Sequence, residues 1–162
     1  MERVDKAALL RAFIEQLGAE LARAKAQAVD AAEGVTHTEN RAEGIKDMRS
    51  TEASYIARGQ AERTAKLEEA VLLLSRLDLR EFGPADAVAL TALIELEHQG
   101  ARSRYFLVPA AGGERIEHAG HRIQTLTPTS PLGRAVIGLR LGEEAEVESP
   151  QGTRLYELLA LA

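Results

Sequence analysis

The sequence has no cysteine, no tryptophan, and only three tyrosines and three phenylalanines among its 162 residues. The absence of cysteine excludes a disulfide framework, a thiolate metal site and a cysteine nucleophile. With so few aromatic rings, the abundant alanine and leucine favour helices packed through small side chains. The chain is therefore expected to fold without disulfides and with a large helical part.

Long apolar runs and a basic excess are also missing. No stretch approaches the roughly 18 consecutive apolar residues that a membrane span needs, and the opening Met-Glu-Arg-Val-Asp-Lys lacks the pattern of a signal peptide. We therefore expect a cytoplasmic protein with no membrane contact. The formal net charge of −5 argues against autonomous binding to a nucleic-acid backbone, so a protein partner is favoured.

The chain divides near Phe82-Gly83-Pro84. Before this point the sequence has helical character, and after it short β-like runs are separated by glycine and proline. Hydrophobic residues make up 45% of the chain and charged residues 28%, as in ordinary globular proteins. We expect a domain over residues 1–82 and a second over residues 83–162.

The first domain contains two apolar seams whose members are spaced alternately by four and three residues. This spacing is typical of a coiled coil and predicts an antiparallel helical hairpin. In both seams leucine, isoleucine and valine give way to alanine, threonine and glutamine toward the chain reversal, so we expect the tip to be thin. The seams are Leu10, Ile14, Leu17, Leu21, Ala24, Ala28 and Ala31, and Ala53, Ala57, Gln60, Thr64, Leu67, Val71 and Leu74.

The reversal itself, near residues 34–50, is longer than a simple turn requires. It carries Glu39, Glu43 and Asp47 at intervals of four, a spacing that a continuous helix would place on one face, although Gly44 interrupts it. One interpretation is a solvated tip with ordinary ion pairs between neighbouring turns. The other is a set of carboxylates carried on a rod to a site elsewhere, where their oxygens help to hold Mg²⁺.

The second domain is expected to be an antiparallel sheet with one short helix, which makes the chain an α+β protein. Ser130 is a good N-cap, Pro131 suits the first helical position, and Gly138 supplies a left-handed stop, so a two-turn helix is predicted between them. Turns are expected at Gln99-Gly100 and through residues 150–152. The predicted strands cover residues 87–97, 104–109, 120–126, 144–148 and 155–161.

Several strings of the second domain, taken in order, resemble the C-terminal domain of the Gre transcript-cleavage factors (GreA/GreB-like) of bacterial RNA polymerase. The resemblance implies an FKBP-like domain that docks at the rim of the polymerase's secondary channel while the coiled coil enters the channel. It implies that Ser130, Pro131 and Leu132 bind the partner. The strings are Ser130-Pro131-Leu132-Gly133-Arg134-Ala135, Ile137-Gly138, Leu141-Gly142-Glu143-Glu144-Ala145-Glu146-Val147, Pro150-Gln151-Gly152 and Tyr156-Glu157.

The same resemblance gives the tip carboxylates a role. In the family they help to hold a second Mg²⁺ that activates water for cleavage of backtracked RNA on the polymerase's own site. Glu39 matches the family's Glu-Asn pair, and Glu43 and Asp47 follow as candidate catalytic carboxylates, but Thr36 stands where the family has an acidic residue and Arg41 is inserted.

We therefore expect channel binding with weak or no stimulation of cleavage. The chain is not expected to be an enzyme on its own. It would need no cofactor alone, share Mg²⁺ only with the polymerase, meet nucleic acid only indirectly within that complex, and be a monomer.

The alternative function is a helical-hairpin adaptor, or an FKBP-like chaperone or isomerase, with no polymerase partner. The second domain has few aromatic residues with which to build an apolar proline pocket, which counts against an isomerase. His118 and His121, beside Glu117, have a spacing compatible with metal binding but lack a fourth ligand. No metal is expected to be held by the isolated chain.

Overall fold

The computed structural model describes the backbone of residues 4–38 and 46–162, and the side chains of residues 4–30 and 54–162. The chain forms two compact units. The helical unit is Glu15–Leu72, and the sheet unit combines Met1–Ile14 with Leu73–Ala162. The start of the first helix and the end of the second are therefore grouped with the sheet.

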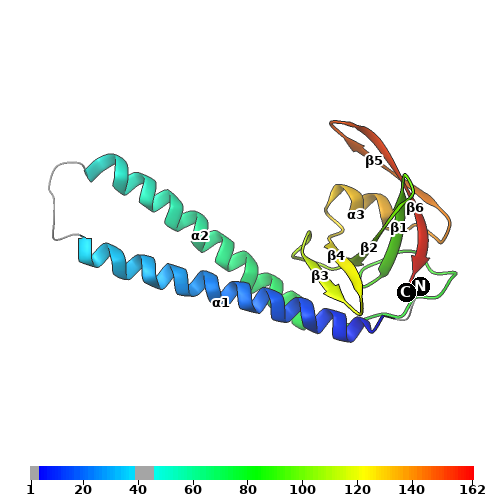
Figure 1. Cartoon of the computed structure of the whole chain (residues 1–162), viewed down its shortest axis with the longest axis horizontal. Helices are drawn as coiled ribbons and strands as arrows, with labels where there is room; N and C mark the ends of the chain where they lie inside the picture. The colour runs from blue at the N-terminus through cyan, green and yellow to red at the C-terminus, as the bar shows by residue number, and fades with distance from the viewer. Residues whose placement is uncertain (1–3, 39–45) are drawn as a thin grey trace. The chain divides into compact units, whose positions relative to one another are not determined.

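Two long helices precede the strands, α1 (Lys6–Thr38) and α2 (Lys46–Ser75), as the seams predicted (Figure 1). The Oδ1 atom of Asp5 accepts hydrogen bonds from the backbone N–H groups of Ala7 and Ala8 at 2.9 and 3.0 Å, which caps the start of α1. The helix α1 continues through Gly34, into the range predicted for the reversal, because one glycine weakens a helix without having to end it. Neither helix, within the described residues, is long and apolar enough to cross a membrane.

In the helical unit, burial along the seams decreases toward the reversal. Leu17 is buried and Val71 is half-buried, whereas Ala28 and Ala57 are exposed. This gradient follows the change from large to small seam residues. Residues 20–27 of α1 and 60–64 of α2 line a polar hollow of about 370 Å³, because small seam side chains leave space there.

The sheet unit contains one six-stranded sheet in the order β3-β4-β2-β1-β6-β5 (Figure 1). All pairings are antiparallel except that between β2 and β4, which is parallel and was not anticipated. The α+β class with one short helix is as predicted. The elements are β1 (Leu93–His98), β2 (Ala101–Leu107), β3 (Arg115–His118), β4 (His121–Leu126), α3 (Pro131–Val136), β5 (Glu144–Ser149) and β6 (Gly152–Leu161).

Two details of the strands differ from the sequence predictions. The strand expected from residue 87 begins only at Leu93, because the preceding backbone turns through Thr91, whose φ is 70°. The strand β3 was not predicted. It pairs with β4 through a two-residue turn in which Ala119 and Gly120 both have positive φ, at 50° and 75°, as a tight hairpin turn requires.

The two faces of the sheet have different cores. On one face a cluster including Ile94, Leu107 and Leu158 packs with Val136 of α3. On the other face Phe106 stacks on Phe13 of α1, with ring centroids 6.4 Å apart. Leu9 and Phe13 are fully buried although neither was placed in a seam, because α1 carries a second apolar face at its start.

Candidate functional site

The segment Thr127–Gly133, which joins β4 to α3, contains the predicted partner-binding residues. We call it the docking segment, after the role that the sequence predicts for it. Ser130 is the N-cap of α3, with extended backbone angles of −71° and 156°, and its Oγ accepts a hydrogen bond from the Gly133 N–H at 3.1 Å. The same hydroxyl donates to the Thr127 carbonyl at 2.8 Å. The expected capped helix is therefore confirmed, and the Ser130 side chain connects the backbone before α3 to the first turn of the helix.

Gly133 is the second constraint on the docking segment. A Cβ atom built at this position would lie 1.9 Å from the carbonyl oxygen of Thr127, which is far inside van der Waals contact. The backbone of Thr127 therefore approaches α3 more closely than any other residue type at position 133 permits. Sequence reasoning included Gly133 only as part of a family string and did not identify this requirement.

The three predicted docking residues do not share one environment. Pro131 is exposed, whereas Ser130 and Leu132 are half-buried. Of these two, Leu132 packs against the core beneath α3. Pro131 is therefore presented to solvent, while the side chain of Leu132 helps to anchor the segment to the sheet unit.

Two further exposed residues of this region were not selected from the sequence. Arg134 and Ile137 follow Pro131 at intervals of three, a spacing that groups side chains on one side of a helix. The Arg134 Nη1 atom donates to the Thr129 carbonyl, which ties its guanidinium to the docking segment. The spacing of three residues from Pro131 to Arg134, and from Arg134 to Ile137, is the sequence pattern that could have identified both residues.

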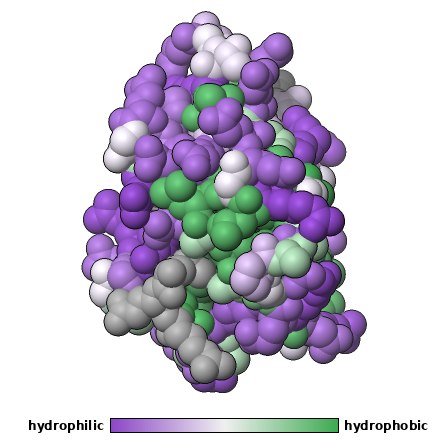
Figure 2. Space-filling model, turned by 90° about the vertical axis from the view of Figure 1, so that its right-hand side faces the viewer, coloured by the Kyte–Doolittle hydropathy of each residue, from purple (hydrophilic) through white to green (hydrophobic). Residues whose placement is uncertain are grey.

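The face of the molecule drawn in Figure 2 carries exposed apolar side chains. Figure 2 shows green side chains gathered near the middle of this face, with hydrophilic residues around them. Among the described residues of the sheet unit, the large apolar side chains with the greatest exposure include Ile137, Leu141 and Leu155. Surface of this kind is a common element of protein interfaces.

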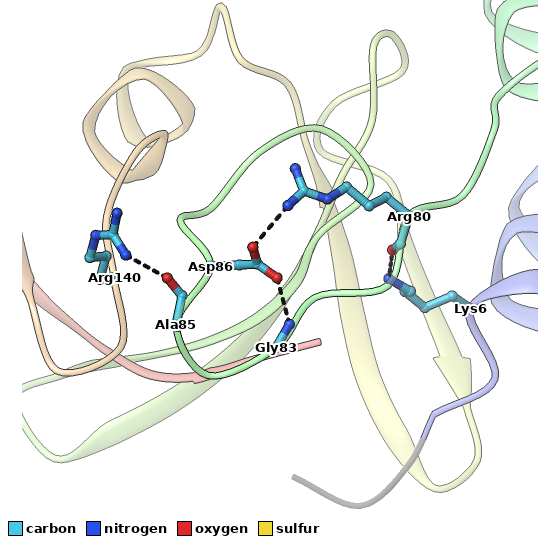
Figure 3. Close-up of polar contacts among 6 residues, drawn as sticks. All are labelled: Lys6, Arg80, Gly83, Ala85, Asp86 and Arg140. Carbon is cyan, nitrogen blue, oxygen red and sulfur yellow. Dashed lines mark hydrogen bonds and ion pairs between the residues drawn. The ribbon is translucent and has the colours of Figure 1, made fainter.

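The segment between α2 and β1 is held by polar contacts within the sheet unit (Figure 3). The Asp86 carboxylate accepts from the Arg80 Nη2 atom at 2.9 Å and from the Gly83 backbone N–H at 2.8 Å. The Arg140 Nη1 atom donates to the Ala85 carbonyl. These contacts connect the segment to itself and to the loop that follows α3.

Lys6 adds a contact from α1 to the same segment. Its amine is buried, donates to the carbonyl oxygens of Arg80 and Thr91, and lies 5.0 Å from the centre of the Phe82 ring. Burial lowers the pKa of Lys6 below its ordinary value of 10.5, and the nearby charge of Glu81 partly opposes this shift. The start of α1 is thus fastened to the chain that leads into the sheet.

Two of the predicted tip carboxylates, Glu39 and Glu43, lie outside the described residues. Asp47 is the second residue of α2, and its side chain also lies outside them. Among the described side chains, no group of three or more histidine or acidic residues is arranged to hold a metal ion. His118 and His121 face each other as register partners across the β3–β4 hairpin.

Known proteins resemble this chain over both units. Residues 83–162 match the family described as "Transcription elongation factor, GreA/GreB, C-term". The chain is 30% identical to the transcription elongation factor GreA of Sphingopyxis alaskensis over 162 residues, covering 96% of this chain and 95% of that protein. It is 31% identical to GreA of Methylococcus capsulatus over 125 residues, covering 76% and 77%.

A relative of a different kind is the transcription inhibitor protein Gfh1 of Thermus aquaticus. It is 25% identical over 99 residues, and the alignment covers 60% of each protein. The likeness to the two elongation factors extends beyond the sheet unit into the helices. The chain therefore belongs to the GreA/GreB family of transcription elongation factors.

Proposed function

We propose that this protein binds bacterial RNA polymerase and regulates transcript elongation from the secondary channel of the enzyme. The sheet unit docks at the rim of the channel, and the helical hairpin enters it. The observation that carries the proposal is the match to a GreA protein over almost the whole length of both chains. The relatives include elongation factors and an inhibitor, and they do not favour an adaptor or isomerase without a polymerase partner. We also propose that the protein acts as a cytoplasmic monomer.

The docking segment supplies the proposed contact. Ser130, Pro131 and Leu132 act together, but in different ways: Pro131 touches the partner, whereas Ser130 and Leu132 position it. A rigid, exposed proline is a suitable anchor because it loses little conformational entropy on binding. The neighbouring Arg134 and Ile137 extend the contact with a cation and an apolar side chain.

Capture of native RNA polymerase by the immobilised full chain tests this docking. Pro131→Glu is expected to weaken capture at least tenfold, since it places a charge at the proposed contact. The matched control is Pro150→Glu, which changes an exposed proline in the turn between β5 and β6. Ile137→Glu is a second variant, and thermal unfolding verifies that each variant is folded. Unchanged capture by both folded variants would remove the docking assignment.

The tip carboxylates Glu39, Glu43 and Asp47 are proposed to approach the polymerase's own catalytic site. Carboxylate oxygens are ligands that Mg²⁺ prefers, and a shared Mg²⁺ would supply activation of water for RNA cleavage. Thr36 replaces an acidic residue of the family tip, and Arg41, Lys46 and Arg49 bring positive charge nearby. We therefore propose binding with weak or no stimulation of cleavage.

Transcript shortening in a defined backtracked complex at low Mg²⁺ tests the role of the tip. The wild-type chain is expected to produce little shortening, and any that occurs should be lost in Glu39→Ala while polymerase capture is retained. Glu69→Ala, at an exposed carboxylate of α2, is the matched control. Robust cleavage by the wild-type chain would overturn the prediction of a regulator without cleavage activity, and cleavage that persists in Glu39→Ala would exclude this carboxylate.

A further inference from the structure

A cavity of about 420 Å³ opens on the sheet unit beside the β3–β4 hairpin. The strand register places Arg115, Gln124 and Tyr105 side by side across β3, β4 and β2. Side chains two residues apart on a strand share a face. A second row of side chains, each two residues from a member of the first row, therefore lies on the same face. That second row is Glu117, Arg122 and Ser103, and both rows line the cavity.

Hydrogen-bond donors dominate this surface. Tyr105 packs against the core beneath α3, and burial raises the pKa of its hydroxyl, although a hydrogen bond with the side chain of Ser103 partly opposes this shift. The amide of Gln124 and the hydroxyl of Ser103 lie beside it in the lining. Arg115 forms no ion pair with any described side chain, and its Nε lies 3.5 Å from Gln124 Oε1, at the limit of a hydrogen bond. Its guanidinium is available to an incoming anion.

The side chains on this face carry a net positive charge, although the net charge of the protein is −5. Arg115 and Arg122 lie in the two rows, Glu117 is the one carboxylate of the lining, and the side chains of Arg102 and Arg104 alternate to the other face of β2. Arg102 and Arg104 are paired with Glu95. Glu117 lies 3.4 Å from Arg122, but their side chains are 77% and 76% exposed, so this pair is weak and an anion of higher charge can replace it.

We propose that this cavity binds a small phosphorylated ligand of about the size of a nucleoside diphosphate. Its volume falls within the range of roughly 300–1,000 Å³ that is typical of small-molecule sites. Arginine forks match phosphate oxygens with paired hydrogen bonds. A ligand with a single carboxylate offers only two oxygens, which are too few to accept hydrogen bonds from two guanidinium groups and from the hydroxyl and amide donors. A diphosphate offers enough oxygens for all of them.

Titration of the full chain with pyrophosphate and with adenosine diphosphate at about 0.15 M salt, followed by calorimetry, tests the proposal. Arg115→Gln is expected to weaken binding of both at least tenfold. Glu117→Gln is expected to tighten it several-fold, because it removes the competing carboxylate. The matched control is Arg154→Gln, which changes an exposed strand arginine whose Nη2 likewise contacts a glutamine, Gln151, at 2.7 Å.

The expected pattern is opposite signs for the Arg115 and Glu117 variants with no change in the control. Failure of pyrophosphate to bind at millimolar concentration, or equal weakening by Arg115→Gln and Arg154→Gln, would overturn the site. Binding of succinate as tight as that of pyrophosphate would exclude phosphate selectivity. Tighter binding of a short single-stranded RNA than of the diphosphate would exclude a small-molecule ligand. These measurements contain no polymerase, so they are independent of the proposed regulatory function.

Discussion

The sheet unit and the helical unit are each stabilised by different interactions. The sheet unit has apolar cores on both faces of its sheet, with side chains such as Phe106 and Leu158 fully buried. In the helical unit, most seam residues are half-buried or exposed, and ion pairs such as Glu20–Arg63 and Lys25–Glu68 join the helices at the surface. Exposed pairs contribute little, whereas buried side chains contribute most of the stability.

This difference suits the two tasks that we propose for the units. The docking segment is fixed by Ser130 and Gly133, on a unit whose core leaves little freedom, so its exposed residues are presented in one geometry. The hairpin depends instead on a narrow seam and tolerates surface changes. Substitutions in the sheet unit should therefore affect stability strongly, and those in the helical unit should affect it weakly.

The largest expected effect comes from Phe13→Ala. The ring is fully buried and stacks on Phe106, so its loss should lower the free energy of unfolding by about 3–5 kcal/mol. Tyr55→Ala in the helical unit, at a residue that is 70% exposed, should change it by less than about 0.5 kcal/mol. Urea denaturation of both variants measures the contrast. Equal losses would mean that the two units do not differ in the way described.

A glycine in each unit should respond to alanine with opposite sign. Gly133→Ala places a methyl group against the Thr127 carbonyl and should destabilise the protein by about 1–3 kcal/mol. Gly59→Ala, in α2, meets no atom within 4 Å and should stabilise it by about 0.5–1 kcal/mol through helix propensity. Thermal unfolding of each variant tests the signs, and stabilisation by Gly133→Ala would contradict the close approach.

Local sequence signals predicted the helices, the cap at Ser130 and the turn at Gln99-Gly100, because each depends on residues close in the chain. The buried role of Phe13 was missed because one periodic seam was assigned to α1 where its first turns have two apolar faces. Strand β3 was missed because its four residues are mostly polar.

Non-local features were beyond the reach of sequence reasoning. The parallel pairing of β2 with β4 depends on how two strands meet in space, and the need for glycine at position 133 depends on where Thr127 lies. The arginine-lined cavity joins residues from three strands, one of which was not predicted. Its residues therefore became a candidate site only through the register.

The two units should also differ in how a lysine affects stability with pH. Burial lowers the pKa of Lys6 in the folded state. Between that lowered pKa and 10.5, the unfolded chain therefore binds more protons at Lys6 than the folded protein does. In this range Lys6 makes the free energy of unfolding rise with pH. In the helical unit, Lys66 donates a hydrogen bond to the Glu62 carboxylate, which raises the pKa of Lys66 above 10.5. The favourable contribution of Lys66 is therefore complete below 10.5 and is lost as pH rises beyond that value.

Urea denaturation of the wild-type protein, Lys6→Met and Lys66→Met at several pH values tests this contrast. As pH rises toward 10.5, the wild type should gain stability relative to Lys6→Met, and it should not gain relative to Lys66→Met. The effect should be smaller than that of losing a core ring, because the amine of Lys6 keeps its carbonyl partners. A wild type that lost stability relative to Lys6→Met over this range would contradict the desolvation of Lys6.

The smallest effect is expected for the ion pair between Glu20 and Arg63, which crosses from α1 to α2. Its side chains are 26% and 71% exposed, so water screens most of their attraction. A double-mutant cycle of Glu20→Ala and Arg63→Ala should give a coupling energy of about 0.2–1 kcal/mol at low salt and less at 1 M salt. The pair Glu62–Lys66, one turn apart within α2, is the matched reference and should give about 0.3–0.5 kcal/mol. A coupling of several kcal/mol between Glu20 and Arg63 that persisted at high salt would show that surface charges, and not the apolar seam, hold the hairpin together.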